Sequence, residues 1–136
     1  MSKALFIVDV QNDFTEGGAL GVDGGDAVAE RITRFLEAHA GDYSVIVASR
    51  DWHDGDNDNG GHFHPEPDFV DTWPEHCVAG TAGAEYHPAL PVQEIDVHVR
   101  KGQGKPAYSM FEETKAKEHP EITEHGGWRA YRASLG

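Results

Sequence analysis

The chain has 136 residues, and 11 lysines and arginines against 24 aspartates and glutamates give it a formal net charge of −13. This charge repels phosphate backbones and anionic lipid headgroups, which argues against nucleic-acid and membrane partners. The length fits one domain, and the longest apolar run, residues 4–8, is far short of the roughly 20 residues that span a membrane. We therefore expect a cytoplasmic protein. Its single cysteine excludes an internal disulfide and a multi-cysteine metal site.

The first fifty residues have the pattern of a strand, a helix and a second strand. Residues 4–10 read ALFIVDV, a β-branched apolar run typical of a strand buried on both faces. Asp26 is the candidate cap of a helix that stops near Gly41, and residues 44–49 repeat the buried-strand pattern. The apolar positions of the helix recur at helical spacing: Val28, Ile32, Phe35 and Leu36. This order of elements predicts an α/β domain with a parallel sheet.

A long segment without clear periodicity follows the second strand. Residues 51–93 are rich in glycine, proline, aspartate, asparagine and histidine, and they exceed an ordinary connection in length. We interpret them as a functional loop with its own packing material. That material is aromatic: Trp52, Phe63, Phe69 and Trp73. Residues 95–100 alternate apolar and polar side chains and predict a third strand, residues 112–118 are a candidate short helix, and the remaining tail shows little period.

Three charged residues stand at the carboxyl ends of the predicted strands. Asp9 lies near the end of the first strand, Asp51 just past the second and Lys101 just past the third. Ligands of open parallel sheets bind beyond this edge, although each residue alone is equally well explained as a solvated charge. Asp9 lies inside an apolar run, so its carboxylate must be partly buried and needs a partner, for which Lys101 is the candidate. Such a pair serves either proton transfer or structure.

Histidines gather in the long segment after the second strand. In extended chain, Asp51 and His53 point to the same side, so a carboxylate oxygen and an imidazole nitrogen can meet one cation. The loop can add His62, His64 and His76. Oxygen and nitrogen ligands without thiolate suit Zn²⁺, Fe²⁺ or Mn²⁺. The alternative is a set of solvent-exposed histidines, and we keep that interpretation for the remaining ones.

Aromatic residues and the cysteine lie close to these groups in the sequence. Phe14, Trp52 and Trp73 are either core residues or the walls of a pocket for a small planar ligand. Cys77 follows His76 directly, and adjacent residues of an extended segment point apart. If His76 binds a metal, Cys77 faces away from it, and we interpret Cys77 as a packing residue rather than a nucleophile.

Five stretches in this order resemble the nicotinamidase branch of the isochorismatase-like (cysteine hydrolase) superfamily. They are ALFIVDVQNDFTEGGAL at 4–20, ASRDWH at 48–53, GHF at 61–63, DFVDTWPEHCVAGTAGAEYHP at 68–88 and VRKGQGKPAYSMFE at 99–112. The resemblance implies a doubly wound, Rossmann-like α/β sandwich. It covers a hydrolase domain at residues 1–113, incomplete at its C-terminus, and leaves a divergent tail at 114–136.

The resemblance also implies an activity, the hydrolysis of nicotinamide to nicotinate and ammonia in NAD salvage. Asp9 and Lys101 match the catalytic aspartate and lysine of the family. The family's metal ligands match four residues, Asp51, His53, His62 and His76, and the residues that flank the substrate ring match Phe14 and Trp73. In the family, a cysteine thiolate attacks the amide carbonyl, and the aspartate takes the thiol proton and passes it to the leaving group.

Two features depart from the family pattern. The nucleophilic cysteine of the family lies in a motif like Gly-x-x-Thr-Asp-x-Cys-Val, which does not occur in these 136 residues, and Cys77 matches the ordinary cysteine after the metal histidine. The stretch DGDNDNGG at 54–61 is longer and more acidic than usual, which makes His64 a substitute for His62.

Three hypotheses follow from these departures. The chain is an amidohydrolase by descent with little turnover of its own, a metal-dependent module that binds a pyridine ligand, or one component of a site to which a partner chain adds the cysteine. Three strands also leave an unpaired sheet edge, so we expect self-association.

Overall fold

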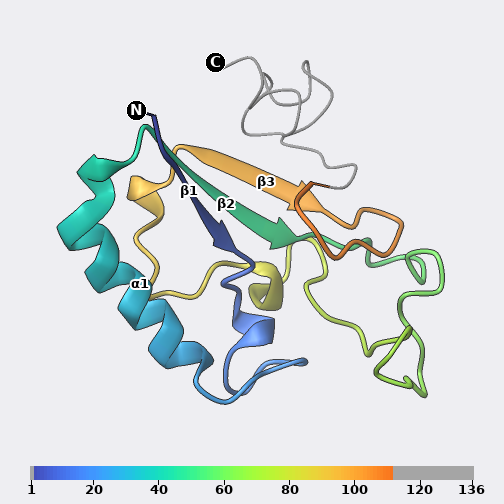
Figure 1. Ribbon diagram of the computed structural model, residues 1–136. Helices are drawn as coiled ribbons and strands as arrows, with labels where there is room; N and C mark the ends of the chain where they lie inside the picture. Colours follow the sequence, from blue (N-terminus) through green and yellow to red (C-terminus); the bar gives the residue numbers. More distant parts are fainter. Residues whose placement is uncertain (1, 112–136) are drawn as a thin grey trace.

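A three-stranded parallel sheet organises the residues that the structure describes, 2–111 (Figure 1). The structure is a computed structural model. The strands β1 (Ala4–Val8), β2 (Val45–Asp51) and β3 (Val97–Lys101) lie in the order β1-β2-β3, and the helix α1 (Gly25–His39) crosses between the first two. This arrangement confirms the predicted α/β fold class. The helix expected at 112–118 and the tail lie outside the described residues, and none of the helices described is long and apolar enough to cross a membrane.

The strands differ from their predicted bounds at the ends that matter for the site. β1 ends at Val8 rather than at residue 10, because Asp9 adopts a left-handed φ of 55° and turns the chain out of the strand. β2 continues to Asp51, which pairs in register with Lys101 at the end of β3. β1 is also not buried on both faces as predicted: it is an edge strand of the described sheet, and Val8 is 56% exposed.

Helix α1 packs on one face of the sheet, but it begins and buries itself differently from the prediction. Its first turn is capped by the carboxylate of Glu16, which accepts the N–H groups of Gly24 and Asp26 at 2.5 and 2.8 Å. Asp26, the predicted cap, instead pairs with His87 at 2.8 Å. Val28 and Phe35 are more than 40% exposed, and the buried positions of the helix are Gly25, Ala29 and Leu36. The core position that the sequence predicts for Val28 is therefore filled by the smaller side chain of Ala29.

The core forms two clusters, one on each face of the sheet. The cluster on the α1 side comprises Ile7, Val10, Ala29, Leu36, Ile46, Ala48, Tyr86, Leu90 and Ile95. The other comprises Val47, Val97, Val99 and Met110. Both clusters use alternate residues of β2, as expected where the centre of a parallel sheet is covered on both sides.

The long segment between β2 and β3 contains no α-helix or regular strand, only short 3₁₀ turns at Ala82–Ala84 and Val92–Glu94. Its first part runs beyond the carboxyl ends of β1 and β2, and its last part returns past α1 to the start of β3 (Figure 1). Isolated bridges tie it down, among them His53 with Val78 and Phe63 with Trp73. The segment is therefore an ordered loop at the edge where the sequence predicts a site.

Candidate metal and ligand site

Lys101 joins the carboxyl ends of all three strands. Its ammonium lies 2.9 Å from Oδ2 of Asp9 and contacts Oδ1 of Asp51, and the residue is 1% exposed. Asp9 is held from its other side by the Ser49 hydroxyl, which donates to Oδ1 at 2.7 Å. The predicted pairing of Asp9 with Lys101 is thus observed, and Asp51 joins it.

The charges of this group stabilise one another. Burial alone would lower the pKa of Lys101, but Asp51 and Asp9 outweigh burial and raise it. Burial would likewise raise the pKa of Asp51, but the nearby His53 and the charge of Lys101 lower it instead. Lys101 is therefore a buried ammonium beside an ionised Asp51 at neutral pH.

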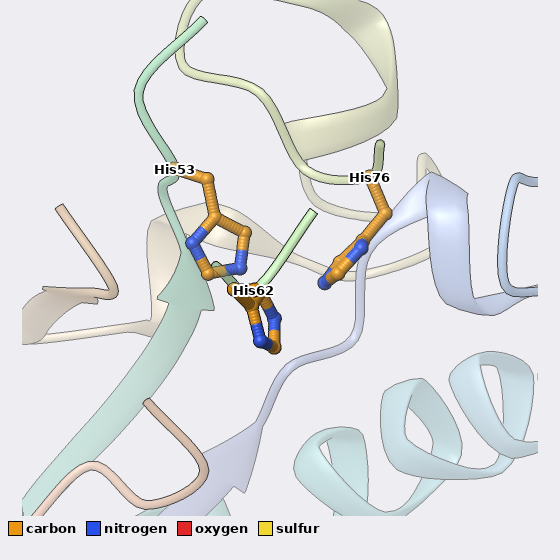
Figure 2. A group of neighbouring side chains, drawn as sticks. All are labelled: His53, His62 and His76. Atoms are coloured by element: carbon orange, nitrogen blue, oxygen red, sulfur yellow. The ribbon is translucent and has the colours of Figure 1, made fainter. Parts of the chain in front are cut away.

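Three histidines come together beside this group, each from a different part of the chain (Figure 2). His53 follows β2 by two residues, whereas His62 and His76 come from the long segment, and one ring nitrogen of each lies within 4.8 Å of the others. Oδ2 of Asp51 lies 3.5 Å from Nε2 of His53 and 3.7 Å from Nε2 of His76. The carboxylate of Asp51 thus faces Lys101 with one oxygen and the histidines with the other.

Hydrogen bonds on the far side of two rings set their tautomers. Nδ1 of His53 lies 2.7 Å from the Gly102 carbonyl, and Nδ1 of His76 lies 2.7 Å from the Pro74 carbonyl. A carbonyl only accepts, so each Nδ1 carries a proton and each Nε2 is the ring atom left to face a cation. Gly102 has a φ of +82°, and a Cβ on it would lie 2.5 Å from the His53 ring, so glycine is required at this position.

The donor set fits a divalent cation. Among the described residues, Nε2 of His53 is buried without a hydrogen-bond partner, which is costly unless a cation meets it. Burial, followed by the neighbouring histidines, lowers the pKa of His62 to about 4, and burial also lowers the pKa of His76. Both rings are therefore neutral near pH 7, the form that binds metal.

His62, rather than its substitute His64, belongs to the cluster. His64 is exposed, and its Nδ1 accepts the N–H of Glu66 at 2.9 Å. The acidic stretch at 54–61 does not displace His62, because the buried Asn59 fixes the stretch from inside. Oδ1 of Asn59 accepts the N–H groups of Asp54 and Gly104 at 2.8 and 3.0 Å.

A pocket of about 680 Å³ opens in front of these groups. Its polar floor consists of Asp9, Asp51, His62, His76 and Lys101. Of the aromatic residues that the sequence leaves open as core or pocket wall, Phe14 and Trp73 line the pocket. Trp52 lies elsewhere, under the guanidinium groups of Arg50 and Arg100 at 4.9 and 4.2 Å from its ring centre. The pocket therefore combines an apolar wall with convergent polar groups, as small-molecule sites do.

Two further residues contact the candidate site and were missed by sequence reasoning. Gln11 is fully buried: its side-chain amide donates to the Asp51 carbonyl at 2.9 Å and to the Ala84 carbonyl at 2.8 Å, and its oxygen accepts the Asp51 N–H at 2.9 Å. Tyr108 lines the pocket, with its hydroxyl 3.3 Å from Nε1 of Trp73 and 3.4 Å from Nδ1 of His62. Neither lies in a periodic or charged pattern, although a glutamine directly after the predicted strand at 4–10 is a signal for Gln11.

Cys77 is a buried packing residue, as predicted, but for a different geometric reason. Its φ is 49°, so the segment is not extended there. Its N–H donates to Asp13 at 2.7 Å, its Sγ lies 4.0 Å from the Gly83 carbonyl, and it is absent from the pocket lining. Burial, followed by the negative charges of Asp51 and Asp13, raises the pKa of its thiol far above the ordinary value. Cys77 is thus a protonated thiol at neutral pH.

Comparison with known proteins agrees with this geometry. The isochorismatase domain profile matches residues 3–119. The nicotinamidase/pyrazinamidase of Mycobacterium tuberculosis is 50% identical over 110 residues, which cover 81% of this chain and 57% of that protein. The nicotinamidase of Escherichia coli is 33% identical over 120 residues, or 80% and 56% of the two chains. The chain thus spans just over half the length of these relatives.

Solved structures show the same relation. The pyrazinamidase of Pyrococcus horikoshii in complex with zinc superposes with a TM-score of 0.65 at 33% identity, over 84% of this chain and 60% of that one. PnC1 from L. infantum in complex with nicotinate gives 0.64 at 37% identity, over 80% and 52%. With its parallel sheet and its strand-end site, the chain belongs to the isochorismatase-like family, in which its relatives named above are nicotinamidases and pyrazinamidases.

Proposed function

We propose that this chain carries the metal-binding and ring-binding part of a nicotinamidase-type amidohydrolase, which converts nicotinamide and water to nicotinate and ammonia. One observation carries the proposal: the histidine cluster and the Asp9–Lys101 pair open into the same pocket, between aromatic walls. Relatives that are nicotinamidases, and a neighbouring structure that holds nicotinate, support this choice of substrate class. The activity would place the protein in NAD salvage, in the cytoplasm.

In this proposal, four residues hold a divalent ion, Zn²⁺, Fe²⁺ or Mn²⁺: Asp51, His53, His62 and His76. When bound, the ion supplies a Lewis acid for the pyridine ring nitrogen. The chain's own part is to orient the imidazoles of His53 and His76, through the carbonyls of Gly102 and Pro74. Phe14 and Trp73 flank the ring of the substrate. A zinc-bound neighbour supports the choice of metal class.

Asp9 and Lys101 supply proton transfer in this proposal. The Asp9 side chain is 20% exposed and lines the pocket, so it can reach a bound substrate. Its Oδ2 accepts from the Lys101 ammonium and its Oδ1 from the Ser49 hydroxyl, which fixes the carboxylate in place. Asp9 would accept the proton of a thiol nucleophile and return it to the departing ammonia, and the Lys101 charge would tune both groups.

A second proposed function follows from the absence of a suitable nucleophile among these residues. The only cysteine of the 136 residues, Cys77, is buried, protonated and outside the pocket lining. This observation favours a metal-dependent module that binds nicotinamide or a related pyridine without hydrolysing it. We propose that the 136-residue chain alone binds the substrate and does not turn it over.

The experiment measures metal content, then nicotinamide binding by calorimetry before and after chelation, and ammonia release in parallel. We expect metal-dependent binding without ammonia release. Ammonia release that Cys77→Ala abolishes would overturn the assignment of Cys77. An absence of binding by the metal-loaded chain would overturn the proposed function itself.

Self-association is a separate part of the proposal. It rests on the β1 edge, where Val8 lies exposed at the border of an apolar groove with Phe35. Sedimentation velocity is expected to show dimers or larger species, and a single monomeric species would contradict this.

A further inference from the structure

Phe69 stands at the rim of the pocket in a backbone conformation that its side chain disfavours. Its φ is 58°, in the left-handed region, where a bulky residue is an outlier. The residue is also 57% exposed, so burial of the ring within the fold offers little compensation. Strained residues of this kind persist only where their surroundings enforce the conformation, and they gather at ligand-binding sites.

The side chain of Asp68 enforces the turn. Its Oδ1 accepts the N–H groups of Val70, Asp71 and Thr72, each at 2.9 Å, and the hydroxyl of Thr72 at 3.0 Å. The N–H of Phe69 donates to the Thr72 carbonyl at 3.0 Å. The backbone donors, first that of Val70, lower the pKa of Asp68. The carboxylate is thus ionised at neutral pH, and it accepts four hydrogen bonds within the turn.

The turn gives its two apolar side chains different environments. Phe69 lines the pocket together with Phe14 and Trp73, and its ring stands edge-on to Trp73, with 6.1 Å between the ring centres and an interplanar angle of 86°. Val70, next in the chain and 73% exposed, is not part of the lining. The left-handed conformation of Phe69 therefore coincides with a ring that lines the pocket, and Val70 is a matched neighbour outside the lining.

We propose that Phe69 is a specificity-determining residue, whose ring closes over a planar aromatic amide beside Trp73. The inference rests on the proposed function, because it assumes that the pocket takes a pyridine carboxamide. A ligand in the pocket would bury ring surface of Phe69 that the free protein exposes, and an aromatic pair favours a planar ring over a puckered one of equal size.

Calorimetry on the zinc-loaded 136-residue chain tests this role, with nicotinamide and its puckered analogue cyclohexanecarboxamide as probes. Loss of one aromatic pair is expected to weaken nicotinamide binding by about 2- to 12-fold in Phe69→Ala. The affinity ratio between the two probes is expected to fall with it. Val70→Ala is expected to leave the nicotinamide affinity unchanged.

A glycine variant distinguishes the effect of losing the Phe69 ring from the effect of the strained backbone. Phe69→Gly also lacks the ring but adopts positive φ freely. We expect it to bind nicotinamide as weakly as Phe69→Ala and to melt at a higher temperature than Phe69→Ala.

The outcomes distinguish this inference from the proposed function. Absence of nicotinamide binding by the unaltered chain would overturn the proposed function. Binding by the unaltered chain that Phe69→Ala retains in full, or that Val70→Ala weakens equally, would overturn the role of Phe69. Equal melting temperatures of the two Phe69 variants would overturn the strain argument.

Discussion

The pocket is assembled from two regions that position their side chains by different means. The strand ends place Asp51 and Lys101 opposite each other through ladder register, so the regular backbone does the positioning. The long segment at 52–96 has no such ladder, and its histidines are held by individual hydrogen bonds, such as the one from His76 to the Pro74 carbonyl. The charged half of the site therefore depends on the sheet, whereas the histidine half depends on local contacts that a bound cation would reinforce.

The largest loss of unfolding free energy is expected when Lys101 is replaced. In Lys101→Met, two carboxylates remain near each other without their shared cation, and breaking a buried ion pair in this way costs about 3–5 kcal/mol. The measurement is urea unfolding, with Arg34→Met on the exposed side of α1 as the control. A loss at Lys101 no larger than that at Arg34 would show that the strand-end region does not depend on this ammonium.

The second-largest effect on stability is expected from metal binding at the histidines of the long segment. At a zinc concentration 100 times the dissociation constant, binding to the folded state adds about 2.7 kcal/mol of stability. We expect the melting temperature to rise with zinc in the unaltered chain and to stay constant in His53→Gln. His64→Gln, outside the cluster, is the matched control and should respond to zinc like the unaltered chain.

Gln11 links the two regions, since it binds the backbone of Asp51 and the Ala84 carbonyl of the long segment. Gln11→Ala leaves buried backbone groups unpaired, at a cost of about 1–3 kcal/mol for each. Asn12→Ala, which removes only the exposed bond to the Ala82 carbonyl, should cost less. Equal losses of unfolding free energy in the two variants, measured by chemical denaturation, would contradict a stabilising role of the Gln11 hydrogen bonds.

At neutral pH the smallest effect on stability is expected from His62, whose titration acts only as the pH falls. Its pKa falls from 6.5 to about 4 in the folded state, so the unfolded chain binds a proton more readily between these values. The stability of the metal-free protein should therefore decrease as the pH falls from about 6.5 to about 4. The decrease should be smaller in His62→Gln, and an identical pH profile of the two proteins would contradict a neutral, partly buried His62.

The strand-end half of the site could be predicted from sequence because its cause is periodic. An apolar run with Asp9 near its end and an alternating run followed by Lys101 place both residues at one edge of a parallel sheet. The histidine cluster was predictable only in outline, from the Asp-x-His spacing and the family resemblance. The early end of β1 at Asp9, the Glu16 cap and the Phe69 turn depend on tertiary contacts or positive φ, which no periodic pattern encodes.

Cobalt spectroscopy tests the central claim, that the histidine cluster and the pocket act as one ligand site. Co²⁺ substituted into the 136-residue chain reports its own coordination through its visible absorption bands. We predict that nicotinamide shifts these bands in the unaltered chain and in Cys77→Ala, and that His62→Gln loses the shift. A Co²⁺-loaded chain whose spectrum does not respond to saturating nicotinamide would contradict the account.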